Sequence, residues 1–283
     1  MDNQNIIEEL ADKYYGLRLL VATGMSQSPE YKKTVLSGQL AKQDKCLDFI
    51  GSSEDKVVQM QTSVGEIEAI CLKNRGDFEL FLQKIAYRCE PVAIPPEIGA
   101  MLISGVINWK KIKEHKKQYL LSGQEDWNAE FRKFTTVASN FKDQVLVISN
   151  GPYSNVFPKQ LGYSKSEWNE ISVQIRLYHE CTHYICRTKY PQTKDAVRDE
   201  VIADCIGLLG AIGKYDEILA LEFLGIDIHG NDTGGRLSFY VSSEAIEKEA
   251  MRALHLVEKL KDITGQNVCE PFEQLDRIMN RFQ

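Results

Sequence analysis

The sequence has no basic surplus, no long hydrophobic run and no regular spacing of cysteines. Among its 283 residues, 34 Lys and Arg stand against 40 Asp and Glu, which gives a formal net charge of −6. Because no excess of positive charge offsets the repulsion from phosphates, we expect no nucleic-acid partner. The apolar runs LRLLVATGM and CIGLLGAIG are short and broken by glycine. We therefore expect no segment that crosses a membrane and no membrane partner.

Signals of secretion are also missing. The first ten residues, MDNQNIIEEL, lack the basic start and the apolar stretch of a signal peptide. Seven cysteines are an odd number without framework spacing, which is typical of reduced thiols. We therefore expect a cytoplasmic protein. With 43% hydrophobic residues, a chain of this length can bury a substantial core in one or two domains.

Histidine is scarce, with five in the chain, yet two of them stand four positions apart in the motif HECTH. If this stretch is a helix, His179 and His183 project from the same face. Each imidazole can then offer a ring nitrogen at about 2.0–2.1 Å to one zinc ion. Such a motif arises by chance in a chain of this composition on the order of once in a hundred. The sequence therefore predicts a metal site, with one zinc ion per chain.

Two downstream carboxylates extend the motif. Glu200 and Asp204 are four apart and share one face of a second expected helix. The proline-containing, polar segment 190–195 lets that helix turn back on the first. Glu200 can then supply a third ligand and leave the fourth position to water, as hydrolytic zinc sites require. Asp199, beside Glu200, is the rival for the third ligand.

HECTH followed by Glu200 and Asp204 resembles the gluzincin branch of the zincin metallopeptidases. Its thermolysin-like members carry HExxH on one helix and ExxxD on the next. The similarity covers residues 168–209. It implies that His179, His183 and Glu200 bind the metal. It also implies that Glu180 is the general base and that Asp204 orients a ligand histidine.

Glu180 has the right position for proton transfer. It follows His179 and is rotated by about a hundred degrees around the helix, so its carboxylate can reach a water on the metal without binding the metal itself. Zinc acidifies such a water and polarises a substrate carbonyl. Glu180 would take the proton as the water attacks, and then deliver it to the leaving amine.

The resemblance carries two further expectations. Gluzincins often place a tyrosine, histidine or arginine where the oxyanion forms, and the candidates here are Tyr240, His229 and Arg236, for which packing or surface roles are the alternative. Zincins commonly line the cleft with an edge strand that pairs with extended substrate. The segment 145–150 can serve in this way, although an ordinary core strand fits it equally well.

The hydrophobic pattern predicts a predominantly α-helical α+β protein. Helical spacing is found in residues 5–23, 31–49, 77–88, 109–121, 125–141, 165–187, 196–212, 216–224, 242–264 and 270–282, and strand patterns in 57–72 and 144–149. The prolines of CEPVAIPPEIG suggest a boundary between residues 1–95, whose role we leave open, and a zincin-like metallohydrolase region at 96–283, although a proline loop inside one domain fits them equally well. A capping box at Ser164 and Glu167 marks the start of the metal-binding helix.

Together these features predict an intracellular zinc metallopeptidase that acts on a peptide or protein substrate. One alternative keeps the zinc and replaces the substrate by a small-molecule amide. Another is a non-catalytic interaction or sensing module, against which the intact Glu180 argues. A structural zinc site that uses Cys181, Cys186 and Cys205 is a third alternative, although these thiols also suit buried apolar positions.

Overall fold

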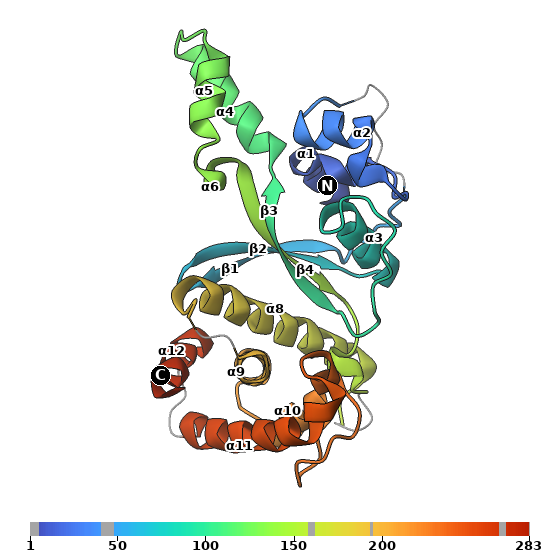
Figure 1. Ribbon diagram of the computed structural model, residues 1–283, viewed down its shortest axis with the longest axis vertical. Helices are drawn as coiled ribbons and strands as arrows, with labels where there is room; N and C mark the ends of the chain where they lie inside the picture. Colours follow the sequence, from blue (N-terminus) through green and yellow to red (C-terminus); the bar gives the residue numbers. More distant parts are fainter. Residues whose placement is uncertain (1–5, 41–47, 158–161, 193–194, 266–269, 283) are drawn as a thin grey trace. The chain divides into compact units, whose positions relative to one another are not determined.

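The computed structural model describes residues 6–40, 48–157, 162–192, 195–265 and 270–282 (Figure 1). The chain forms two compact units. The N-terminal unit comprises residues 1–58, 70–94 and 102–147, and the C-terminal unit comprises residues 59–69, 95–101 and 148–283. Both units thus take segments from each side of residue 95. The fold is α+β, as the sequence predicts.

Four strands form one sheet. They are β1 (Lys56–Thr62), β2 (Gly65–Leu72), β3 (Ala100–Ile107) and β4 (Lys142–Ser149), in the order β1-β2-β4-β3. The first two form the expected hairpin, with its turn beside Gly65, whose φ of 122° favours glycine. β4 coincides with the strand expected at 144–149, and its residues 145–149 are buried.

The expectation of an edge strand at 145–150 is wrong. β4 lies between β2 and β3, so both of its backbone edges are already hydrogen-bonded to neighbours and no substrate strand can pair with it. The ordinary core strand, which was the alternative, is what the structure contains. Periodicity identifies a strand, but strand order depends on pairings between distant segments and is not encoded locally.

The N-terminal unit contains the helices that precede residue 147. They are α1 (Ile6–Lys13), α2 (Pro29–Tyr31), α3 (Arg75–Ile85), α4 (Trp109–Leu121), α5 (Trp127–Phe134) and α6 (Ala138–Phe141), with 3-10 turns at Tyr15–Arg18 and Met25–Gln27 and a π turn at Lys32–Leu36. α4 has the expected bounds. The helix expected at 31–49 ends early, and residues 41–47 of it lie outside the described residues. The helix expected at 125–141 is split into α5 and α6.

The C-terminal unit contains α8 (Lys165–Lys189), α9 (Ala196–Ile212), α10 (Glu217–Leu224), α11 (Ile246–Thr264) and α12 (Pro271–Phe282), with short turns at Tyr153–Asn155, Arg236–Phe239 and Ser243–Ala245. α8 begins at the expected capping box, in which Ser164 and Glu167 bond to each other's backbone. α9 is capped by Asp195 and ends at Gly213, whose φ of 74° suits glycine.

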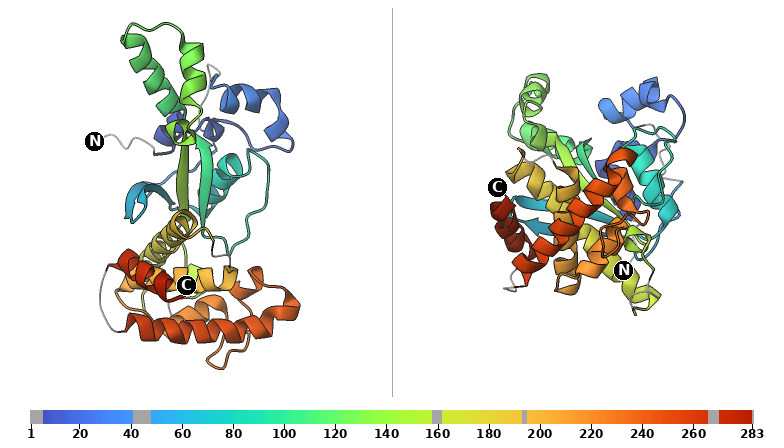
Figure 2. Two further views of the ribbon diagram at one scale, coloured as in Figure 1. Left: turned by 60° about the vertical axis from the view of Figure 1, so that its left-hand side comes forward. Right: turned by 60° about the horizontal axis from the view of Figure 1, so that its bottom comes forward.

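α9 lies at the centre of this unit, in contact with α8, α10, α11 and α12 (Figures 1 and 2). A helix surrounded in this way has to be apolar on nearly all sides, and α9 is, with Val201, Ile202 and Ile206 in its core. Glu200 and Asp204 are therefore exceptions that need partners, because a buried carboxylate is costly unless it is paired.

α8 and α9 approach each other closely. A Cβ atom at Gly210 of α9 would lie 2.2 Å from the ring of Tyr178 on α8, and one at Gly207 would lie 3.0 Å from Ile175. Figure 1 looks along α9 while α8 lies across the view, so the helices cross steeply. The second helix therefore does not run back alongside the first, as we expected from segment 190–195. Glycine at the contact permits this short separation, which brings the polar faces of the two helices together.

Among the described residues, no helix has both the length and the apolar character needed to cross a membrane.

Candidate metal centre

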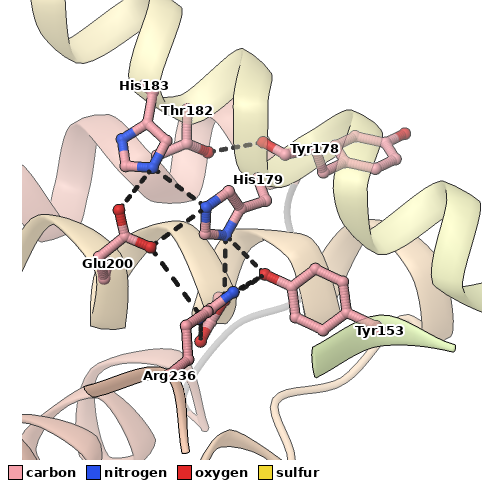
Figure 3. Close-up of polar contacts among 8 residues, drawn as sticks. Tyr153, Tyr178, His179, Thr182, His183, Glu200 and Arg236 are labelled. Atoms are coloured by element: carbon pink, nitrogen blue, oxygen red, sulfur yellow. Dashed lines mark hydrogen bonds and ion pairs between the residues drawn. The ribbon is translucent and has the colours of Figure 1, made fainter. Parts of the chain in front are cut away.

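Two imidazoles and one carboxylate converge where α8 and α9 meet (Figure 3). The Nε2 atoms of His179 and His183 are 3.0 Å apart. The Oε1 atom of Glu200 lies 3.2 Å from Nε2 of His183, and its Oε2 atom lies 3.4 Å from Nε2 of His179. These three residues from two helices therefore form a tight triangle of possible ligand atoms.

The contacts around the triangle are short enough for a metal site. Ligand atoms at about 2.0–2.1 Å from a tetrahedral zinc ion are separated by about 3.3 Å, and Glu200 comes this near to the histidines with a different oxygen for each, Oε1 for His183 and Oε2 for His179. Within the described part of the chain, Oε2 of Glu200 is buried and has no hydrogen-bond partner. Two ring nitrogens that face each other beside an unsatisfied carboxylate oxygen fit a divalent cation well.

The charges of the triangle also suit a cation. Burial opposes a positive charge on His179, but hydrogen bonds to Asp204 and Glu200 outweigh it and raise the pKa of His179 to about 9. Burial likewise opposes the negative charge of Glu200, yet hydrogen bonds from both histidines hold its pKa well below the usual value. The carboxylates of Glu200 and Asp204 thus make the surroundings of His179 favourable to positive charge.

Glu200, and not its rival Asp199, faces the imidazoles. Asp199 is the next residue on α9 and lies in a different direction, where its Oδ1 atom is 3.3 Å from Nη2 of Arg198. Neighbouring helix positions are rotated by about 100°, so only one of two adjacent carboxylates can face α8. Among the described residues, the group able to hold a metal contains no cysteine.

The three cysteines near the motif lie outside the triangle. Cys181 and Cys205 are buried and Cys186 is half-buried. Burial raises the pKa of the Cys181 and Cys186 thiols to about 12. Because a thiol binds zinc as the thiolate, these environments favour the role of small apolar residues.

Asp204 lies behind His179, one of the two histidines that the resemblance left open as its partner. Its Oδ1 atom is 2.9 Å from Nδ1 of His179, and its side chain is fully buried. A carboxylate at this position accepts the hydrogen of Nδ1, which leaves the Nε2 lone pair directed at the triangle.

Tyr153 is the functional residue that the sequence analysis missed. Its hydroxyl oxygen is 2.9 Å from Nδ1 of His179, 2.6 Å from Oδ1 of Asp204 and 2.6 Å from Nη1 of Arg236 (Figure 3). It lies in the turn segment NGPYSN just after β4. The signal available in the sequence was a tyrosine inside a polar turn, because its hydroxyl requires a hydrogen-bond partner once the ring is buried.

The three residues expected near an oxyanion lie in three different places. Arg236 is on the Nδ1 side of His179, bonded to Asp204 and Tyr153, whereas the triangle is on the Nε2 side. Nη2 of Arg236 nevertheless comes within 4.0 Å of Oε2 of Glu200. Tyr240 also lies near the ligand triangle: burial raises the pKa of its hydroxyl, and the adjacent Glu200 adds to the rise. His229 is exposed in a turn whose backbone is bonded to Asp227, and it makes no such approach among the described contacts.

Glu180, the expected general base, is half-buried on α8. Its carboxylate makes no hydrogen bond or ion pair with any residue that the structure describes. The neighbouring carboxylates Glu200 and Asp204, by contrast, are held by histidine and arginine. A partly accessible carboxylate without a structural partner remains available for proton transfer.

Fold and site together define an α+β protein with a group of two histidines and one glutamate able to hold a cation. The chain belongs to a family described as a family of unknown function, DUF7005, which it matches over residues 1–277. No curated protein and no solved structure matches the chain.

Proposed function

We propose that this protein is a zinc-dependent hydrolase that cleaves peptide bonds. The observation that supports this proposal most strongly is the convergence of His179, His183 and Glu200, which each bring one possible ligand atom within 4.8 Å of the others. Three protein ligands from histidine and carboxylate are typical of catalytic zinc sites, which keep one position open, whereas structural sites are closed by four ligands.

The chain's own residues divide the remaining tasks. A zinc ion at the triangle would supply Lewis acidity and an acidified water. The carboxylate of Glu180, which no described residue binds, would accept a proton from that water and return it to the leaving amine. Tyr240, half-buried beside Glu200, would donate a hydrogen bond to the developing oxyanion.

The first test is the metal content of the purified protein, measured by inductively coupled plasma mass spectrometry. We expect about one zinc ion per chain, lost in His179→Ala. If the protein contains no metal after incubation with zinc, the proposal is wrong.

The second test separates metal binding from catalysis. Glu180→Gln should retain zinc and lose turnover of a peptide library, because the amide has the same shape but cannot accept the proton. Glu170→Gln is the matched control, since Glu170 lies on the same helix and is exposed. Turnover by Glu180→Gln at the wild-type rate would eliminate Glu180 as the base. Zinc binding without hydrolysis of any peptide would reject the peptidase assignment.

A further inference from the structure

Behind His179, on the side away from the ligand triangle, four polar side chains form a closed cluster. Besides His179 they are Tyr153, Asp204 and Arg236 (Figure 3). Asp204 is fully buried, and the side chain of Arg236 is 12% exposed. The resemblance to gluzincins accounts for the aspartate alone, so the tyrosine and the arginine require a separate explanation.

The donors and acceptors of this cluster can be assigned in only one way. Arginine has donors only, so Arg236 donates to the hydroxyl oxygen of Tyr153 and to Asp204. The carboxylate of Asp204 accepts only, so the Tyr153 hydroxyl gives its hydrogen to Oδ1 of Asp204. The oxygens of Tyr153 and Asp204 then both present lone pairs to Nδ1 of His179, each at 2.9 Å.

This assignment shows which ring nitrogen of His179 has to carry a hydrogen. An unprotonated Nδ1 would face two oxygen lone pairs at 2.9 Å, so Nδ1 has to carry a hydrogen. Nε2, which faces Glu200 and His183, is then the nitrogen that a cation would bind, in place of any proton there. With two acceptors on different chain segments, the ring is held against rotation more firmly than one carboxylate could hold it.

Arg236 also compensates a buried charge. Asp204 has no exposed surface, and a carboxylate in that position is strongly unfavourable without a cation. The guanidinium contacts Asp204 and lies 4.0 Å from Oε2 of Glu200. Its positive charge therefore balances Asp204 and leaves Glu200 for the ligand triangle.

Several hydrogen bonds fix the position of Tyr153. Arg176 of α8 donates to the carbonyl oxygens of Gly151 and Pro152, and the backbone N–H of Tyr153 donates to Oγ of Ser172 at 3.0 Å. The next residue, Ser154, has a φ of 50°, which is unfavourable for a residue with a side chain. Such a conformation persists only where the surroundings enforce it, and is common at functional sites.

Arg236 is positioned by a contact between two glycines. A Cβ atom at Gly225 would lie 2.5 Å from Cα of Gly235, so the two backbones can approach only without side chains. The N–H of Thr233 donates to the carbonyl oxygen of Gly225 at 2.8 Å. This contact holds the end of α10 against the residue directly before Arg236, and so fixes the backbone position from which the side chain of Arg236 extends.

From these contacts we infer that Tyr153 and Arg236 are positioning residues that hold His179 in the orientation and tautomer needed to bind a metal ion. The inference rests on the proposed metal site and goes beyond it, because it assigns roles to two residues that bind neither metal nor substrate. Loss of either role should weaken metal binding by roughly 10–100-fold, the usual effect of removing a partner of a ligand histidine.

The test is to titrate the metal-free protein with zinc against a chelator, and with cobalt(II) while the absorption spectrum is recorded. We compare the wild type with Tyr153→Phe, Arg236→Gln and Arg236→Lys. Tyr153→Phe and Arg236→Gln should bind zinc roughly 10–100-fold more weakly, with an altered cobalt spectrum because the imidazole is reoriented. Arg236→Lys retains the charge but not the forked geometry, and should recover part of the affinity.

Two control variants make the comparison sharp. Tyr178→Phe removes a hydroxyl from the residue before His179, whose ring points away from the imidazoles (Figure 3). Arg252→Gln removes an arginine that pairs with Asp195 in the same unit. Both controls should keep wild-type zinc affinity and the wild-type cobalt spectrum.

The outcomes separate this inference from the proposed function. If the wild type binds zinc and Tyr153→Phe binds it equally well with the same spectrum, the positioning roles are overturned and the metal site stands. If the wild type binds no zinc or cobalt, both proposals fall. Circular dichroism reports folding; if Arg236→Gln does not fold, Tyr153→Phe, which loses a single oxygen atom, decides the question.

Discussion

Both units bury charged side chains, but the groups that bind these side chains differ between the two units. In the N-terminal unit, Asp77 accepts the backbone N–H groups of Ile50 and Gly51, each at 2.9 Å, and Lys84 donates to the carbonyl oxygen of Leu17 at 3.0 Å. In the C-terminal unit, the charged side chains face one another around His179.

The difference shows what marks a functional site. Burial of a charge is not sufficient, because both oxygens of Asp77 are already bonded to backbone N–H groups and the carboxylate anchors a turn. The cluster at His179 has an unsatisfied oxygen, Oε2 of Glu200, and two nitrogens in contact. Polar side chains that converge around an atom with no hydrogen-bond partner among the described residues therefore indicate a binding site better than burial alone does.

The largest effect that we predict concerns the two adjacent carboxylates of α9. Glu200→Gln should weaken zinc binding by more than the roughly 100-fold expected for an outer partner, because a ligand itself is lost. Asp199→Asn is the control and should retain wild-type affinity, since Asp199 faces Arg198. Titration against a chelator measures both. A stronger effect from Asp199→Asn would reverse the assignment of the third ligand.

The N-terminal cluster should respond in stability and not in metal affinity. Asp77→Ala removes the acceptor for two backbone N–H groups, and we expect a loss of roughly 3 kcal/mol in the free energy of unfolding. Urea denaturation measures this loss, and a zinc titration of the same variant should match the wild type. A zinc affinity reduced tenfold would show that the two clusters are coupled.

Two glycines provide a more graded comparison. Gly213 and Gly225 end α9 and α10 with φ values of 74° and 75°. Alanine at either should cost about 1 kcal/mol of stability from the left-handed backbone. Only at Gly225 would the new Cβ also collide with Gly235, whereas nothing lies within 4 Å at Gly213. Gly225→Ala should therefore be the less stable variant by thermal unfolding, and it alone should weaken zinc binding. Equal effects of the two substitutions would show that the contact between Gly225 and Gly235 does not influence zinc binding.

The smallest effect concerns a half-exposed pair at the start of α9. Hydrogen bonds from Arg252 to Asp195 lower the pKa of that carboxyl group, against the opposing effect of burial. Since the folded pKa is depressed, the pair should stabilise the protein above the unfolded pKa near 4 and cease to do so as pH falls through the folded value. Exposure limits the contribution to under about 1 kcal/mol. The difference in unfolding free energy between wild type and Asp195→Asn should be constant from pH 5 to 7 and shrink below pH 4. A difference that grew on acidification would refute this assignment.

The helices of the site could be predicted from sequence because their signals are local. A capping box starts α8, an aspartate cap and a glycine bound α9, and i, i+4 spacing places His179 with His183. The resemblance implied that Asp204 contacts one of the two histidines, but neither the choice of His179 nor the steep crossing of the helices could be read from the sequence.

The other features depend on contacts between distant segments. Tyr153 reaches the site from a loop 26 residues before His179, and Arg236 arrives from a segment 32 residues after Asp204. No periodicity links such positions. The side of His179 on which Arg236 lies, and the central place of β4 in the sheet, are set by packing alone.

The crossing of α8 and α9 has a thermodynamic consequence. Because the ligands come from both helices, a bound ion would act as a reversible cross-link within the hydrophobic core that surrounds α9. Binding to the folded chain alone raises its stability by RT ln(1 + [L]/Kd), about 4 kcal/mol at a thousandfold excess over Kd. The unfolding temperature would then rise with zinc concentration in the wild type and stay constant in His179→Ala. The unfolding temperature would therefore report how fully this site is occupied by metal before any substrate is known.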